Sequence, residues 1–321
     1  MNFIQQAYKG KTDWWRFILT VLATLIGWQV VGMIPLMITA VLKSPNSAAF
    51  EKTLTNIAQG KDIEPNLFLF VMILSFAIGL FFLLASVFLI HKRPIRSVIT
   101  SRKNIDWKRV FFAFGLWFSL AVAMLSLDYF ANPEHFEWHF KLQPFLILVL
   151  ISLLLLPLQT SFEEILFRGY FMQGIGIAFK NAWVPLFFTA IAFGLLHGAN
   201  PEVDKLGYGI FVYYIGTGLF FGIATLMDEG LELSLGMHAA NNIVAAVFVT
   251  THWTAFQTDA LLLDTSEPSL GLQAYLPVFV IYPLILWVYS KKYAWKNWKE
   301  KLFGKIRKPI DNQIDSIGTF N

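Results

Sequence analysis

The feature that most constrains the fold of this chain is the recurrence of nearly uninterrupted apolar stretches of about 20 residues. An α-helix rises ~1.5 Å per residue, so a stretch of this length crosses the ~30 Å hydrocarbon core of a bilayer. Charged residues make up only 14% of the chain, whereas a soluble domain carries about 25%. These values exclude an ordinary soluble globule, a disordered chain and a nucleic-acid-binding module. We therefore predict an all-α, polytopic membrane bundle of about eight transmembrane helices, formed by residues 1–321 as a single integral membrane domain.

The apolar stretches define eight predicted spans, at residues 17–42, 67–90, 110–130, 144–179, 183–199, 206–227, 232–250 and 273–290. The first span is longer than the ~7–15 residue apolar core of a signal peptide, so we expect it to be retained. The fourth is longer than one crossing needs, because a helix of that length would extend ~54 Å. Pro157 lies inside it and is expected to kink or divide it. A tilted or broken helix, or an extension past the membrane surface, would accommodate the excess length.

Basic residues are distributed unevenly between the two sides of the predicted bundle. They concentrate in the N-terminal segment, in the loop of residues 91–109 and in the tail of residues 291–321, and are sparse in the loops on the other side. Because loops rich in Lys and Arg stay in the cytoplasm, both termini are predicted to be cytoplasmic, and an even number of spans agrees. We expect an integral protein of a bacterial plasma membrane, with the lipid bilayer around it and no nucleic-acid partner.

Strongly polar residues interrupt three of the predicted spans: Glu163, Glu164 and Arg168 in the fourth, His197 in the fifth, and His238 with Asn242 in the seventh. Ionisable groups within a membrane are costly, and by default they indicate a functional site. Glu164 and Arg168 are four residues apart with the acid first, which predicts an ion pair along one helix. Adjacent helical residues point about 100° apart, so Glu163 is left without a local cation and is the better candidate for proton transfer. The alternative is a structural ion cluster that ties helices together.

The histidine motifs are weaker signals when each is taken alone. His238 and Asn242 share one helix face, where an imidazole and an amide can bind a water, a metal ion or a carbonyl oxygen. The alternative is an interhelical hydrogen-bond pair, which is common in membranes. His197 follows Phe193 at i+4 in Phe-Gly-Leu-Leu-His-Gly, whose glycines can simply allow close helix packing. The joint occurrence of polar groups on three spans is what favours a functional site.

Several enzyme classes are excluded by what the sequence lacks. The chain has no cysteine, which excludes disulfides, thiol nucleophiles and Cys-ligated zinc. It contains no His-Glu-x-x-His, no Gly-x-Ser-x-Gly and no Walker A sequence. A zincin-like helix, a serine-hydrolase elbow and ATP-driven transport are therefore not expected.

Three motifs occur in one order: Glu163-Glu164-x-x-x-Arg168, Phe193-x-x-x-His197 and His238-x-x-x-Asn242. Together they resemble the signature motifs of the CPBP intramembrane protease family, which includes type II CAAX prenyl endopeptidases and bacteriocin-processing or self-immunity proteins. The resemblance covers residues 145–250 and implies a protease core there. It also implies an all-helical bundle that hydrolyses a peptide bond, with Glu164 and Arg168 supporting the site.

The resemblance further assigns a role to each remaining motif residue. Glu163 would activate a water molecule, and Asn242 would stabilise the oxyanion. His197 and His238 would help to bind the water or a metal ion. We expect these four residues to converge on one polar cavity within the bundle.

The use of a metal is open at this point. Two histidines and a glutamate, here His197, His238 and Glu163, are a sufficient zinc set with water as the fourth ligand. The same residues can also work without a metal, as a glutamate-type hydrolase. The expected substrate is a membrane-associated protein or peptide, with a CAAX-like C-terminus as one candidate. The alternatives are a membrane regulatory or bacteriocin-immunity protein that keeps the motifs without catalysis, and a transporter with a buried proton relay.

The charge asymmetry gives a testable topology. Protease added to right-side-out vesicles should leave the C-terminal tail intact, because the basic tail is predicted to lie in the cytoplasm. The same protease should remove the tail in inside-out vesicles, as detected by an antibody to a C-terminal tag. Cleavage of the tail from the outer side would contradict the predicted orientation.

Overall fold

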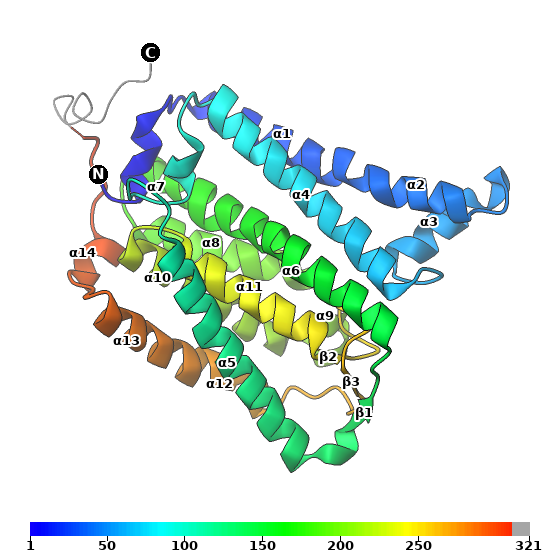
Figure 1. Cartoon of the computed structure of the whole chain (residues 1–321). Coiled ribbons are helices and arrows are strands. Elements are labelled where there is room, and N and C mark those ends of the chain that lie inside the picture. The colour runs from blue at the N-terminus through cyan, green and yellow to red at the C-terminus, as the bar shows by residue number, and fades with distance from the viewer. Residues whose placement is uncertain (310–321) are drawn as a thin grey trace.

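The computed structural model describes residues 1–309 as a bundle of helices (Figure 1). Residues 310–321, which end the predicted basic tail, lie outside the described residues. The α-helices are α1 (Trp14–Gln29), α2 (Ile34–Lys43), α3 (Phe50–Ala58), α4 (Pro65–Leu89), α5 (Trp107–Ala131), α6 (Leu142–Glu164), α7 (Met172–Phe179), α8 (Trp183–Leu196), α9 (Pro201–Leu206), α10 (Phe211–Asp228), α11 (Glu232–Val247), α12 (Leu272–Leu276), α13 (Tyr282–Lys292) and α14 (Trp298–Phe303). Short 3-10 helices lie at Ile4–Lys9, Val31–Met33, Ser47–Ala49, Ile95–Val98, Pro133–His135, His197–Ala199 and Tyr208–Ile210, and π-helical segments at Ile165–Phe171 and Pro277–Ile281.

Each of the eight predicted spans contains a helix, although residues 249–250, at the end of the seventh, form a β-strand. Within residues 1–309, six helical stretches are long and apolar enough to cross a membrane: Trp14–Lys43, Pro65–Leu89, Trp107–Ala131, Leu142–Phe179, Tyr208–Asp228 and Ala274–Lys292. The fifth predicted span forms a shorter apolar helix, Trp183–Ala199, and the seventh forms α11, which has 16 residues. The predicted fold class, an all-α polytopic membrane bundle, is confirmed, with two of its helices shorter than the rest.

One small β-sheet departs from the all-α prediction. Its strands are β1 (Phe136–Trp138), β2 (Val249–Thr250) and β3 (Leu262–Asp264). β3 lies in the middle, antiparallel to β1 and parallel to β2. The sheet ties the connection between α5 and α6 to the segment that follows α11 (Figure 1).

The fourth predicted span is one continuous helical stretch that changes helix type along its length. α6 continues past Pro157 to Glu164, so the helix is not divided at the proline. The π-helical segment Ile165–Phe171 follows directly and leads into α7. Segments of π-helix are rare and occur frequently at functional sites. The change of helix type therefore lies at the acidic motif, and α6 is not divided at Pro157.

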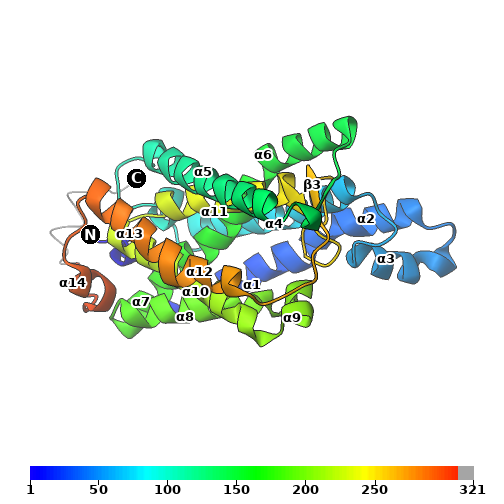
Figure 2. The same ribbon diagram turned by 90° about the horizontal axis from the view of Figure 1, so that it is seen from below.

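α11 lies inside the bundle and brings the polar motifs together. It packs against α5, α6 and α10, and α10 in turn packs against α8 (Figures 1 and 2). Glycines permit the close approaches. A β-carbon on Gly236 of α11 would overlap the carbonyl oxygen of Val110 on α5, and one on Gly218 of α10 would crowd the backbone of Ala190 on α8. Small residues at such contacts are typical of helix pairs in membranes, where association depends on packing.

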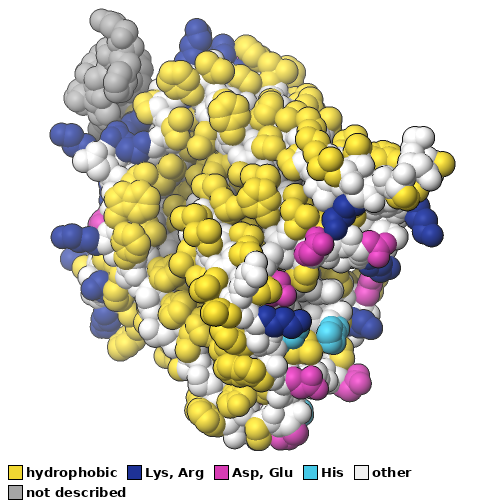
Figure 3. Space-filling view, turned by 45° about the vertical axis from the view of Figure 1, so that its right-hand side comes forward, with side chains coloured by type: hydrophobic (Ala, Val, Ile, Leu, Met, Phe, Trp, Pro, Cys, Tyr) yellow, Lys and Arg dark blue, Asp and Glu magenta, His cyan; other side chains and the backbone are white. Residues whose placement is uncertain are grey.

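The outer surface of the bundle is largely apolar. Large side chains such as Leu22, Phe81, Leu127 and Leu154 are exposed on α1, α4, α5 and α6. The space-filling view shows this apolar surface, with most Lys and Arg toward its edges (Figure 3). Such a surface suits the hydrocarbon of a bilayer. The helices also satisfy their backbone polar groups internally, as a membrane requires. The chain is therefore an integral membrane protein.

The two ends of the described chain meet on one side of the bundle. Gln5 Nε2 donates a hydrogen bond to the carbonyl oxygen of Arg307 at 2.9 Å. On this side Arg102 pairs with Asp228 and Glu232 at 2.8 and 3.0 Å, which links the loop before α5 to the turn between α10 and α11. A shared side agrees with an even number of spans, and its cytoplasmic placement stays a prediction.

The contact between α5 and α11 gives a stability prediction. Gly236→Ala should lower the midpoint of thermal unfolding in detergent, because the added methyl group overlaps the backbone of α5. Overpacking of this kind costs ~1–3 kcal/mol. Gly115→Ala, on α5 itself, is the matched control, since a β-carbon there meets nothing within 4 Å. That control should leave the midpoint unchanged or raise it, because Ala favours helix. Equal midpoints for the two variants would contradict the described contact.

Candidate functional site

The predicted site residues come from separate parts of the bundle that tertiary packing brings together. They are placed by the end of α6 (Glu163, Glu164), the π-helical segment (Arg168), the 3-10 turn after α8 (His197) and α11 (His238, Asn242). α6 packs directly against α11, and α8 packs against the π-helical segment. The three motifs therefore meet although they are far apart in the chain.

A buried ion pair lies at the centre of this region. Arg168 Nη1 donates to Glu164 Oε1 at 2.9 Å, and both side chains are fully buried. Arg168 Nη2 donates to the carbonyl oxygen of Gly218 on α10 at 3.3 Å. The predicted i, i+4 pair is confirmed, and it extends to a second helix, α10.

Aromatic rings surround the arginine of this pair. The guanidinium carbon of Arg168 lies 4.2 Å from the ring centroid of Phe193 and 5.4 Å from that of Phe221. A cation at these distances is attracted to the ring face. The same rings exclude water, so the positive charge is held by Glu164 and by π-systems.

His238 is oriented by the ion pair and faces Glu163. Its Nδ1 lies 3.0 Å from Glu164 Oε1, and its ring stacks on Phe221 at a centroid distance of 5.2 Å. The carboxylate of Glu164, paired with an arginine, can only accept a hydrogen bond, so Nδ1 of His238 carries the ring proton. The other ring nitrogen, Nε2, then lies 3.6 Å from Glu163 Oε2. The Glu163 carboxylate, which has no cation beside it, and the His238 imidazole therefore face each other.

Glu163 and Asn242 are joined by a residue that the motifs did not identify. Gln159 Nε2 donates to Glu163 Oε1 at 2.6 Å, and Asn242 Nδ2 donates to Gln159 Oε1 at 2.9 Å. Gln159 is buried, as is Asn242. The sequence held a signal for it, because Gln159 is a polar residue four positions before Glu163 on the same helix face.

His197 lies beside this network and contacts it through an aromatic ring. Its Nδ1 lies 2.8 Å from the carbonyl oxygen of Phe193, and its ring stacks on Tyr214 at a centroid distance of 4.7 Å. The Phe193 ring lies 4.7 Å from that of His197 and 6.1 Å from that of His238. Within residues 1–309, hydrogen bonds and ion pairs connect the other predicted residues in one cluster, whereas His197 adjoins them through Phe193.

The histidines have part of the arrangement that a metal ion requires. In each, Nδ1 contacts an acceptor and Nε2 is left available, as is usual for metal-ligating histidines. However, no three His, Asp or Glu side chains in the described part of the chain are grouped so as to hold a metal ion. The predicted zinc set of Glu163, His197 and His238 is not assembled in this arrangement, and zinc binding stays a prediction.

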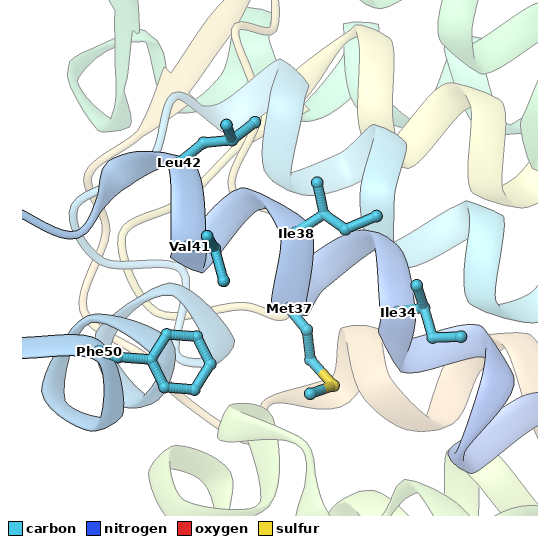
Figure 4. A pocket seen from close by; sticks show the side chains of 6 residues that line it. All are labelled: Ile34, Met37, Ile38, Val41, Leu42 and Phe50. Carbon is cyan, nitrogen blue, oxygen red and sulfur yellow. The ribbon is translucent and has the colours of Figure 1, made fainter. Parts of the chain in front are cut away.

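A separate hollow lies between α2 and α3 (Figure 4). It is lined by side chains that are all apolar: Ile34, Met37, Ile38, Val41, Leu42 and Phe50. α2 and α3 extend away from the helices that carry the motifs (Figure 2). This hollow offers no group for acid–base chemistry, so we place the candidate site at the polar cluster.

Comparisons with known proteins agree with the position of this cluster. The family described as "Type II CAAX prenyl endopeptidase Rce1-like" matches residues 142–244, from the start of α6 to near the end of α11. The chain is 34% identical over 257 residues to "Uncharacterized protein YyaK" of Bacillus subtilis (strain 168), covering 78% of this chain and 83% of that relative. No solved structure matches the chain. The matched range contains every predicted site residue.

The buried ion pair gives a prediction about stability. Glu164→Gln should lower the thermal midpoint in detergent, because it leaves the Arg168 cation buried without a counter-ion, a defect worth ~3–5 kcal/mol. Arg168→Gln should have a similar effect. The loss of stability in the double variant should be smaller than the sum of the two single losses, because both charges are removed together. Additive losses in the double variant would show that the two residues do not act as a pair.

Proposed function

This chain belongs to the type II CAAX prenyl endopeptidase Rce1-like family, and on that premise we propose that it is a glutamate-type intramembrane endopeptidase. The observation that carries the proposal is the placement of Glu163. Its Oε1 accepts a hydrogen bond from Gln159, and its Oε2 faces His238 Nε2 at 3.6 Å, within a helical bundle. A carboxylate held in this way, without a cation of its own, is suited to accept a proton.

Amide hydrolysis begins with a water molecule made nucleophilic. A water set against Glu163 Oε2 and His238 Nε2 can donate one hydrogen bond to each atom. As the water oxygen adds to the scissile carbonyl carbon, Glu163 takes one proton as general base. When the C–N bond breaks, the same carboxyl group returns a proton to the leaving nitrogen. The carboxylate is thus regenerated at the end of the cycle.

The negative charge on the carbonyl oxygen needs a donor. The Nδ2 group of Asn242 has two N–H bonds, and Gln159 accepts only one of them. The second can donate to the developing oxyanion, a type of contact worth ~3–4 kcal/mol of barrier. His238, held at Nδ1 by Glu164, is steadied in the ring orientation that this geometry needs.

The substrate is proposed from the family and from the surroundings of the site. The description of the matched family names CAAX prenyl endopeptidases. The site of this chain lies among helices whose outer faces are apolar, so a substrate would approach within or along the membrane. We therefore propose a membrane-associated peptide, with a prenylated CAAX-like terminus as the first to test.

The proposal predicts loss of turnover when Glu163 can no longer accept a proton. Purified protein in detergent is assayed with two internally quenched peptides, one ending in a farnesylated Cys-aliphatic-aliphatic-X sequence and one carrying a single membrane span. Glu163→Gln should reduce turnover by ~10²–10⁴-fold, because the amide keeps the shape but cannot act as a base. Glu137→Gln, an exposed site in β1, is the matched control and should keep full activity.

Two further outcomes separate the alternatives. The chelator 1,10-phenanthroline should leave turnover within ~2-fold if the reaction is of the glutamate type. Loss with chelator and recovery with Zn²⁺ would instead support the zinc set. Equal turnover by the wild type and Glu163→Gln, or cleavage of neither peptide, would count against the enzyme and favour a non-catalytic regulatory or immunity role.

A further inference from the structure

A directed chain of hydrogen bonds leads into the site from α5. Trp117 Nε1 donates to Asn241 Oδ1 at 3.2 Å, and Asn241 Nδ2 donates to Asn242 Oδ1 at 3.1 Å. Asn242 Nδ2 donates to Gln159 Oε1 at 2.9 Å, and Gln159 Nε2 donates to Glu163 Oε1 at 2.6 Å. The chain crosses from α5 through α11 to α6, and its bonds all run in one direction.

The two ends of this chain fix the orientation of the three amides between them. The indole N–H of Trp117 can only donate, and the carboxylate of Glu163 can only accept. An amide that turned over in the middle would set two acceptors or two donors against each other. A single arrangement therefore satisfies every link, and hydrogen bonds in series strengthen one another in a low-dielectric interior.

We propose that Trp117, Asn241 and Gln159 are positioning residues that preset Asn242 and Glu163 for amide hydrolysis. This inference rests on the proposed function and extends it. Without the chain, the Asn242 amide has two orientations, and one of them would present an oxygen to the developing oxyanion. With the chain in place, Nδ2 points toward Gln159 and the site, and Oδ1 is held by Asn241. Glu163 Oε1 is occupied by Gln159, which leaves Oε2 toward His238.

The surroundings of Trp117 show that its role can be separated from the rest of the site. Its ring is buried and packs against Tyr282 at a centroid distance of 5.9 Å. It contributes one hydrogen bond, to Asn241, and lies three links away from Gln159. Trp117→Phe keeps an aromatic ring in the core and removes the donor together with part of the indole, a loss of volume that the Trp28→Phe control shares. Trp28→Phe is the matched control, because the Trp28 ring contacts Phe76 and Phe162 and its indole makes no hydrogen bond to a side chain of the described residues.

Asn241 allows the direction of the chain to be tested separately from its packing. Asn241→Asp has nearly the same shape, and at alkaline pH its carboxylate only accepts. The Asn242 amide would then turn over so that its Nδ2 donates to this carboxylate. Gln159 would turn over in response, and its oxygen instead of its N–H group would face Glu163. Asn241→Leu fills similar space but imposes no direction. If the direction of the hydrogen-bond chain matters, Asn241→Asp should lower kcat more than Asn241→Leu. If only packing matters, Asn241→Leu should lower kcat at least as much.

The measurement is kcat and KM on the farnesylated peptide, with thermal midpoints to exclude unfolding. Gln159→Met and Asn241→Asp should lower kcat by ~10–100-fold, the range found when hydrogen-bond partners of metal-ligating side chains are replaced, with KM within ~2-fold. Trp117→Phe and Asn241→Leu should lower kcat by ~3–10-fold, and Trp28→Phe should match the wild type. Wild-type kcat in folded Gln159→Met and Asn241→Asp, beside an inactive Glu163→Gln, would overturn the positioning role and leave the proposed function standing.

A second measurement does not depend on turnover. Difference infrared spectra of the wild type minus Glu163→Gln isolate the carboxylate stretching band of Glu163. That band should shift in Gln159→Met and in Asn241→Asp, because each change alters the hydrogen bond at Oε1. It should be unchanged in Trp28→Phe. An unshifted Glu163 band in Gln159→Met would overturn the positioning role of Gln159, even if the protein cleaves neither peptide.

Discussion

The buried ion pair between Glu164 and Arg168 is the constraint on which the rest of the site depends. Two full charges with no exposed surface need neighbouring groups that compensate for part of the lost hydration, and within the described residues only Glu164 Oε2 and Arg168 Nε of the pair keep no hydrogen-bond partner. The neighbours do so from several helices: a carbonyl of α10, the rings of Phe193 and Phe221, and the imidazole of His238. The pair therefore fixes how α6, α8, α10 and α11 meet.

Two polar networks leave the end of α6 in different directions, as the geometry of adjacent helical residues requires. Glu164 leads to Arg168 and His238, and Glu163 leads through Gln159 to Asn242. They come together again where His238 Nε2 faces Glu163 Oε2. One network is ionic and the other consists of amides, so one carboxylate is held by a cation while its neighbour is left free to accept a proton. This division of roles supports Glu163 as the base in the proposed reaction.

The backbone is irregular where the chemistry is concentrated. The π-helical segment begins directly after Glu164, and close packing at Gly218 and Gly236 brings α10 and α11 near their partners. Bulkier residues at these glycines would push α11 away from α5 and α10 away from α8.

The sequence by itself determined what depends on local spacing. Apolar stretches of about 20 residues must become helices in a bilayer, and an acid four residues before a base on one helix predicts the Glu164–Arg168 pair. Only the tertiary structure decided the partners between helices: His238 with Glu164, Asn242 with Gln159, and Trp117 with Asn241. It also placed a π-helical segment after Glu164, left α6 undivided at Pro157, and paired strands from two distant loops. The physical reason is that helical period fixes which side chains share a face, whereas the packing of whole helices fixes which faces meet.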